Sequence, residues 1–161
     1  MKRLLATVAL VLPLGLAPAL AAGPTVKEID VTVDMAAVEN PAAARYWGTL
    51  EADLESAILA RLTDQIADDG ANLIIDVEEV ELSNGFQEAT GMADTRLVAN
   101  VKQTHDTDNS RFEAYDLTVD VNQALLLMPE GTDVTLITAD TREFYDAMIR
   151  AFADAVAKKV K

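Results

Sequence analysis

Apolar residues recur every four positions in one stretch of the chain, which is the spacing of residues on one face of a helix. They are Leu50, Leu54, Ile58, Leu62 and Ile66. Asn40, followed by a proline, is a good helix start, because asparagine caps helix N-termini and proline is tolerated in the first turn. Gly70 is a good stop, since glycine easily takes the left-handed conformation found at helix ends. The pattern predicts one helix over residues 40–70; the alternative is two pieces, broken at Gly48, with Thr49 capping the second.

Apolar and polar residues alternate in four further segments, and this is the pattern of half-buried strands. The segments cover residues 29–33, 73–82, 97–101 and 115–121. In the second segment the apolar set moves by one residue between Val77 and Val80. Because a β-bulge adds one residue and restores the inward face, a bulge is predicted near Glu78 or Glu79.

A second helix is predicted over residues 140–160. Asp140 and Glu143 have the spacing of a capping box. Its apolar face is formed by Phe144, Met148, Phe152 and Ala155, and is widened by Ile149 and Val156. Lysines follow at positions 158, 159 and 161, at the helix end where the dipole favours positive charge.

The segment between the last strand and this helix is ambiguous. Leu125, Leu126, Leu127 and Met128 follow one another, and periodicity does not distinguish a strand from a helical turn in so short a run. The run is either buried or an exposed patch that contacts a partner. Residues 129–131 predict a turn, and residues 134–138 predict a short fifth strand.

Together these elements predict a single α+β domain in the order β-α-β-β-β-(β)-α. It is a two-layer sandwich, in which two amphipathic helices pack on one face of a four- to five-stranded, mostly antiparallel sheet. The first β-α-β unit is expected to be a right-handed crossover between parallel strands. This element order resembles that of small bacterial envelope modules such as the amino-terminal domain of the Tol-Pal translocation protein and the curli-secretion lipoproteins. The resemblance implies an envelope role and transfers no residues.

The start of the chain has the pattern of an export signal. Lys2 and Arg3 precede an apolar stretch over residues 4–16, and small residues follow at alternate positions, as signal peptidase requires. The expected cleavage site is formed by Ala19, Ala21 and Ala22. We therefore expect residues 1–21 to be a signal peptide and residues 22–161 to be the folded domain. An uncleaved anchor is disfavoured, because the apolar stretch is shorter than the roughly 20 residues that span a membrane.

The chain contains no cysteine. This excludes disulfides, thiolate metal sites, cysteine nucleophiles and the lipid-modified cysteine of a bacterial lipoprotein. Export without disulfides is typical of a bacterial envelope compartment. The sequence predicts a periplasmic or secreted protein that is not a lipoprotein and has no transmembrane segment in its mature part.

Acidic residues outnumber basic ones by 27 to 13, which gives a formal net charge of −14. Nucleic acids and anionic lipids bind through Lys and Arg, so neither is an expected partner. A cation or a basic protein or peptide fits the charge. The alternative is that the acidic residues serve solubility alone.

The sequence offers little catalytic chemistry. The single histidine, His105, and Ser110 flank one turn beside Asp106 and Asp108, but a polar turn does not orient a triad well. Asp106, Asp108 and Ser110 also have the spacing that opens a calcium loop, although the glycine and the closing glutamate of that loop are missing. We expect no catalytic residue, no metal site and no cofactor.

One group of acidic residues is predicted to share the sheet face opposite the helices. It comprises Asp30, Asp34, Asp76, Asp116 and Asp120. Arg96 and Lys102 are expected to join them from the third strand. Such a face either receives a basic partner or is simply solvated.

The leading functional hypothesis is a non-enzymatic periplasmic protein that acts as an interaction or assembly module of the cell envelope, with an envelope protein or cationic peptide as partner. The second is a small-molecule or cation-binding protein that uses the acidic face or residues 104–110. The third is a hydrolase based on carboxylates, of which the chain has many.

Overall fold

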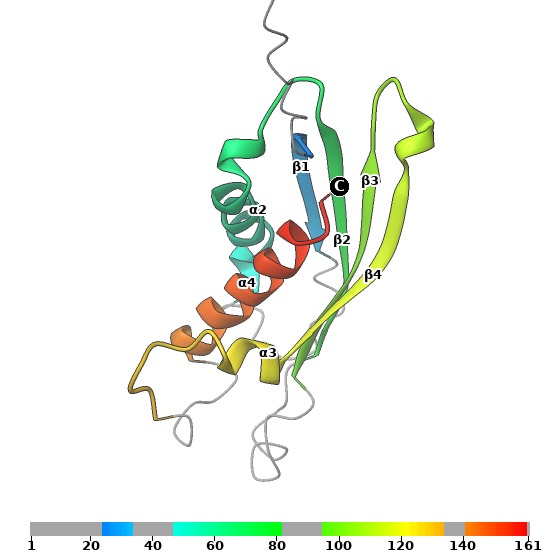
Figure 1. Ribbon diagram of the computed structural model, residues 1–161. Helices are drawn as coiled ribbons and strands as arrows, with labels where there is room; N and C mark the ends of the chain where they lie inside the picture. The colour runs from blue at the N-terminus through cyan, green and yellow to red at the C-terminus, as the bar shows by residue number, and fades with distance from the viewer. Residues whose placement is uncertain (1–23, 34–46, 82–94, 134–140, 161) are drawn as a thin grey trace, which may run out of the picture.

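The computed structural model describes residues 24–33, 47–81, 95–133 and 141–160. These residues form one four-stranded mixed sheet with helices packed against it (Figure 1). The strands are β1 (Val26–Val33), β2 (Ala71–Glu81), β3 (Arg96–Thr104) and β4 (Glu113–Asp120), in that spatial order. β1 and β2 are parallel, whereas β2, β3 and β4 are successively antiparallel. The α+β architecture expected from the sequence is confirmed.

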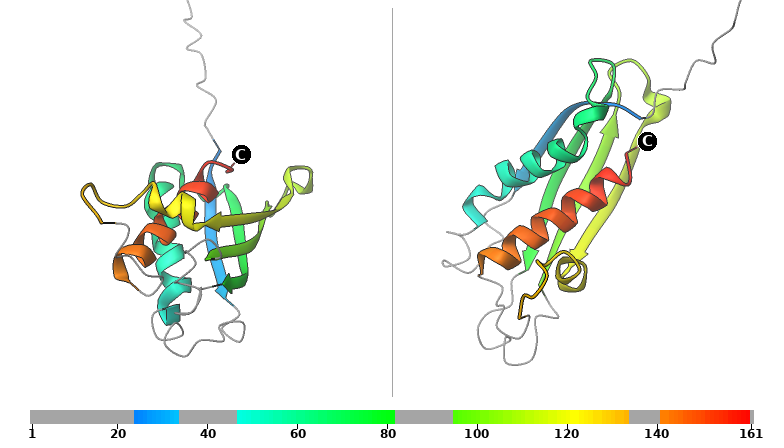
Figure 2. Two further views of the ribbon diagram at one scale, coloured as in Figure 1. Left: turned by 90° about the horizontal axis from the view of Figure 1, so that it is seen from below. Right: turned by 60° about the vertical axis from the view of Figure 1, so that its left-hand side comes forward.

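The helical elements of the described residues are η2 (Trp47–Thr49), α2 (Leu50–Arg61), η3 (Thr63–Gln65), η6 (Asn109–Arg111), α3 (Val121–Leu125) and α4 (Arg142–Ala157). The short turn η6 lies in the connection between β3 and β4, away from the two long helices (Figure 1). The two long helices, α2 and α4, contact each other and the sheet, and both lie on its same side (Figure 2). Their arrangement leaves the opposite face of the sheet uncovered by the described helices. None of the described helices is long and apolar enough to cross a membrane.

The core lies between these two layers. Its helical contribution includes Leu50, Leu54, Ile58, Leu62, Phe144, Met148 and Phe152, none more than 1% exposed. The sheet contributes the predicted inward residues, including Leu73, Ile75, Val77, Leu97, Ala99 and Val101. The helical and strand periodicities therefore identified the two faces that meet in the core.

The predicted end of the first helix, at Gly70, is wrong. α2 ends at Arg61, and the 3-10 turn η3 follows it. Ile66 is 44% exposed and forms a bridge with Val26 instead of continuing the helix. Gly70 does not have the positive φ expected of a helix stop; it lies against the backbone of Val26.

The start of that helix is closer to the two-piece alternative. Thr49 occupies the N-cap position of α2, and the 3-10 turn η2 precedes it. The Thr49 hydroxyl donates a hydrogen bond to the Asp53 carboxylate at 2.7 Å and does not cap a backbone N–H. The predicted start at Asn40 lies outside the described residues.

The predicted bulge in the second strand is confirmed. In the β2–β3 ladder Val77 pairs with Ala99 and Glu79 pairs with Val98, so Glu78 is the extra residue. The bulge explains how the apolar positions before and after it both belong to one strand.

The ambiguous run after β4 begins as a helical turn. Asp120 caps α3, because its side chain accepts a hydrogen bond from the Gln123 N–H, and the Gln123 side chain accepts one in return from the Asp120 N–H. Beyond α3, Leu126 is 84% exposed, whereas Leu125, Leu127 and Met128 are partly buried against the core. The predicted fifth strand, 134–138, lies outside the described residues.

The second long helix has its predicted apolar face but a different cap. Phe144, Met148 and Phe152 are buried, as the periodicity indicates. The N-cap is Thr141, whose hydroxyl accepts a hydrogen bond from the Phe144 N–H at 3.4 Å, and not Asp140. Because Thr141 is the N-cap, the N3 residue is Phe144 and not Glu143, so the predicted Asp140–Glu143 capping box does not form.

Candidate functional site

The open face of the sheet carries a row of four polar side chains, one from each strand. The strand register aligns Thr32, Asp76, Asn100 and Asp116. The Thr32 hydroxyl donates to the Asp76 carboxylate at 3.2 Å, and the Asn100 amide donates to the Asp116 carboxylate at 3.0 Å. Two strand spacings, about 10 Å, separate the two acidic residues. The row thus presents two exposed carboxylates, each of which accepts a hydrogen bond from a side chain on a neighbouring strand.

The neighbouring row on this face is mixed in character. Asp30 on β1 is exposed and aligns with Ile74, Lys102 and Ala114. Ile74 is 36% exposed, so the centre of the face contains a small apolar area. The face can therefore contact a partner through both carboxylates and an aliphatic side chain.

The five acidic residues predicted for the sheet face opposite the helices do not all lie exposed on it. Asp30, Asp76 and Asp116 lie exposed on the open face. Asp120 lies at its end, paired in register with Arg96, and its carboxylate caps α3. Asp34 lies outside the described residues. Only three of the five residues can be argued as a shared surface. The signal for the Asp120 cap was the capping-box spacing of Asp120 and Gln123, which the strand alternation does not take into account.

In the 104–110 turn, Asp106 is hydrogen-bonded to β1 and β2, and Asp108 is hydrogen-bonded within the turn. Asp106 accepts hydrogen bonds from Lys27 on β1 and from the Asn72 amide on β2. Chiefly the Lys27 contact lowers the pKa of the Asp106 carboxyl. Asp108 accepts bonds from the N–H and the hydroxyl of Ser110, and these lower its pKa. Both carboxylates are therefore already hydrogen-bonded, and a cation would have to displace these donors in order to bind them.

His105 does not form the imagined triad with Ser110. Its side chain is buried, and neither ring nitrogen has a hydrogen-bond partner among the described residues. The Ser110 hydroxyl donates to Asp108. Nor do the described residues contain a group of three or more His, Asp or Glu side chains positioned to hold a metal ion.

A groove of about 320 Å³ between α2 and α4 is lined by a hydrogen-bonded pair of ionisable residues, Asp53 and Tyr145. The Tyr145 hydroxyl donates to the Asp53 carboxylate at 2.6 Å. This bond lowers the pKa of Asp53, while burial, reinforced by the adjacent carboxylate, raises the pKa of Tyr145. Both pKa values move away from neutrality, whereas a general acid or base works best with a pKa near the operating pH. The pair therefore acts as a link between the helices.

We expect Tyr145→Phe to destabilise the protein by about 1 kcal/mol at neutral pH, because a charge-assisted bond to a partly exposed carboxylate is lost. The folded-state pKa of Asp53 is depressed, so the wild-type advantage is present above the unfolded value and disappears as pH falls through the folded value. Urea unfolding at neutral and acidic pH measures this. Tyr115→Phe, which removes a hydroxyl without a carboxylate partner, is the matched control; equal pH dependence in both variants would contradict the assignment.

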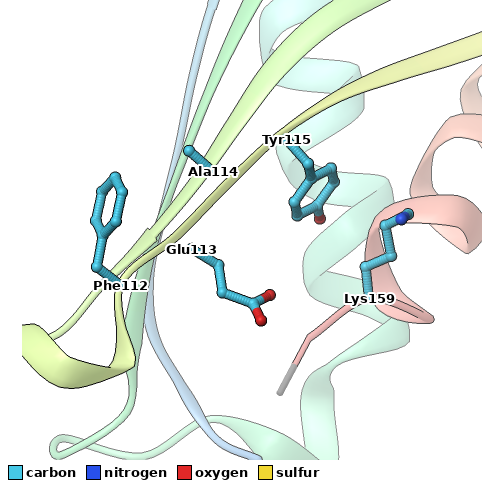
Figure 3. A pocket seen from close by; sticks show the side chains of 5 residues that line it. All are labelled: Phe112, Glu113, Ala114, Tyr115 and Lys159. Atoms are coloured by element: carbon cyan, nitrogen blue, oxygen red, sulfur yellow. The ribbon is translucent and has the colours of Figure 1, made fainter.

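A second cavity, of about 410 Å³, lies where β4 begins (Figure 3). It is lined by Phe112, Glu113, Ala114, Tyr115 and Lys159. The Lys159 ammonium lies 4.7 Å from the centre of the Tyr115 ring. Burial raises the pKa of Tyr115 to about 12, with the nearby Gln103 amide opposing the shift. In Figure 3, Glu113 and Tyr115 extend toward Lys159, while Phe112 lies on the other side of the strand.

Sequence reasoning missed this cavity. It assigned Lys159 to the dipole of the last helix and included Tyr115 only as the first position of the alternating segment 115–121. The available signal was the alternation that places Glu113 and Tyr115 on the same side of one strand. What the alternation does not show is that the end of α4 passes beside the start of β4.

Comparison with known proteins finds only distant similarity. No protein-family model and no curated protein sequence matches the chain. The fold is similar to that of a Xanthomonas campestris protein of family DUF330, with 17% identity, 89% of this chain and 88% of the other covered, and a TM-score of 0.49. It is also similar to a candidate lipoprotein from Caulobacter crescentus, with 9% identity, coverage of 82% and 86%, and a TM-score of 0.42. Neither similarity is close enough to assign a function.

Proposed function

We propose that this chain is a non-enzymatic periplasmic protein that acts as an interaction or assembly module of the bacterial cell envelope and binds a basic partner. The observation that carries the proposal is the open face of the sheet. The helices α2 and α4 cover one side only, and Asp30, Asp76 and Asp116 are exposed on the other.

Electrostatics supports a basic partner. The chain carries a net charge of −14, and a field of one sign accelerates encounter with an oppositely charged protein. The hydrogen bonds to Asp76 and Asp116 restrict the two carboxylates to fixed positions on the face. Fixed charges lose less side-chain entropy when they pair with a partner.

The ionisable groups give less support to an enzyme. The carboxyl groups of Asp53, Asp106 and Asp108 have a shifted pKa, and all three shifts are downward. A carboxylate-based hydrolase needs one carboxyl whose pKa is raised so that it can donate a proton. The export signal expected in residues 1–21 supports the envelope location.

The proposal is tested by reversing the charge of the open face. The double variant Asp76→Lys/Asp116→Lys should weaken capture of basic envelope proteins by at least about tenfold, because complementary charges are replaced by repulsive ones. Immobilised protein is exposed to an envelope extract, and retained proteins are identified by mass spectrometry.

The matched control is Glu51→Lys/Glu143→Lys, which makes the same change in net charge at exposed positions of α2 and α4. It should retain most of the captured proteins. If both double variants lose capture equally, overall charge is responsible and the open face is not the site. If neither loses it, the proposed face is rejected.

A further inference from the structure

β4 is the last strand of the described sheet, and it pairs only with β3. On such an edge strand, alternate peptide groups direct their N–H and C=O away from the sheet, and they form a template for one more strand. Figure 1 shows β4 as the outer strand on the side away from β1.

The other edge, β1, is protected by the protein itself. Val26 is bridged on its free side by Ile66, and the Ala67 N–H donates to the Val26 carbonyl at 2.9 Å. Further along the strand, the Val31 N–H donates to the Glu55 carboxylate at 3.3 Å. These contacts satisfy backbone groups that an added strand would need, so β4 is the better site for strand addition.

The cavity at the start of β4 lies against this strand. Four of its five lining residues are the consecutive residues 112–115. Side chains of neighbouring strands that lie opposite each other point to the same face of a sheet. A residue of an added strand opposite Glu113 or Tyr115 would therefore point into the cavity, toward Lys159.

The chemistry of the cavity favours a cationic side chain. The Tyr115 ring already has one cation, Lys159, beside it, and aromatic faces attract Lys and Arg. Glu113 adds a negative charge close enough to raise the pKa of Tyr115. On the opposite face of the same strand, Asp116 is exposed, so basic residues are favoured on both sides of an added strand.

We propose that an extended basic peptide segment of the partner adds to the free edge of β4 as a fifth strand. One Lys or Arg of that segment enters the cavity between Glu113 and the Tyr115 ring and takes the place of Lys159. Main-chain hydrogen bonds to β4 provide affinity, and the cavity provides selectivity for a long cationic side chain. This inference rests on the proposed function, because it specifies how a basic partner is held.

The test uses synthetic peptides of alternating Lys and Thr, of about six to eight residues, the length of an ordinary strand. Two further peptides carry N-methyl groups on one or the other set of alternate backbone nitrogens, so that charge is unchanged. Binding is measured by isothermal titration calorimetry. One of the two methylated peptides should bind at least about tenfold more weakly than the parent, and the other should bind almost normally, because only one set of N–H groups faces β4.

Variants of the protein locate the site. Glu113→Lys should weaken binding of the parent peptide by at least about tenfold, since it places a repulsive charge in the cavity. Glu28→Lys, an exposed change on β1, is the matched control and should bind as the wild type does. Amide hydrogen exchange should slow at alternate residues of β4 when the peptide is added.

The outcomes separate the two proposals. If both methylated peptides bind as well as the parent, strand addition is overturned. If, in addition, the variant Asp76→Lys/Asp116→Lys no longer binds the peptides, the proposed function stands with the open face as its site. If the wild type binds none of the peptides, strand addition is overturned, and the capture experiment with envelope extract then decides the proposed function alone.

Discussion

Leu54→Ala is expected to lower the free energy of unfolding by about 2–5 kcal/mol, because removing a buried leucine side chain loses its transfer free energy and leaves a cavity. Leu54 lies in the middle of α2 and has no exposed surface. It belongs to the single core cluster in which α2 meets the sheet and α4. Urea unfolding followed by circular dichroism measures the change.

Leu59→Ala is the control for this prediction. Leu59 lies on the same helix but is 49% exposed, and surface substitutions usually change stability by less than about 0.5 kcal/mol. Because both variants make the same chemical change in one helix, helix propensity cancels from the comparison. Equal losses of stability would contradict the orientation of α2 on the sheet.

The fold could be predicted from sequence wherever the face of a helix or strand on which a residue lies determines whether that residue is polar or apolar. Leu50, Leu54, Ile58 and Leu62 are buried as their spacing indicates, because a helix on a sheet has one apolar face. The Glu78 bulge was also visible, since an extra residue in a strand moves the whole apolar set to the other face. These features depend on local periodicity alone.

Features that depend on how distant segments meet could not be predicted. Ile66 continues the four-residue spacing of α2, but the chain must leave the helix to reach β2, and Ile66 pairs with Val26 of β1 instead. Thr141 and Asp140 are both residues that cap helices, and their sequence does not decide between them. Local pattern thus gave the right type of element and the wrong boundary.

The same distinction applies to the candidate sites. Alternation identified Asp30, Asp76 and Asp116 as residues of one face, but only the register shows that Asp76 and Asp116 share a row. The β4 cavity requires Lys159 at the end of α4 to lie over Tyr115. That contact joins two elements with no common local pattern, so sequence reasoning had no means of finding it.

Gly70→Ala should destabilise the protein by about 3 kcal/mol, because overpacking against groups that cannot move is costly. A Cβ at position 70 would lie 2.4 Å from the carbonyl carbon of Val26 and 2.6 Å from the Lys27 nitrogen, so β1 would have to shift away from the residues that precede β2. Gly48→Ala is the matched control, since Gly48 is exposed and a Cβ there would meet nothing within 4 Å; a stabilisation of up to about 1 kcal/mol is expected from the reduced entropy of the unfolded chain. Urea unfolding midpoints of the two variants should therefore move in opposite directions. A Gly70→Ala variant as stable as the wild type would contradict the close approach of Gly70 to the backbone of β1.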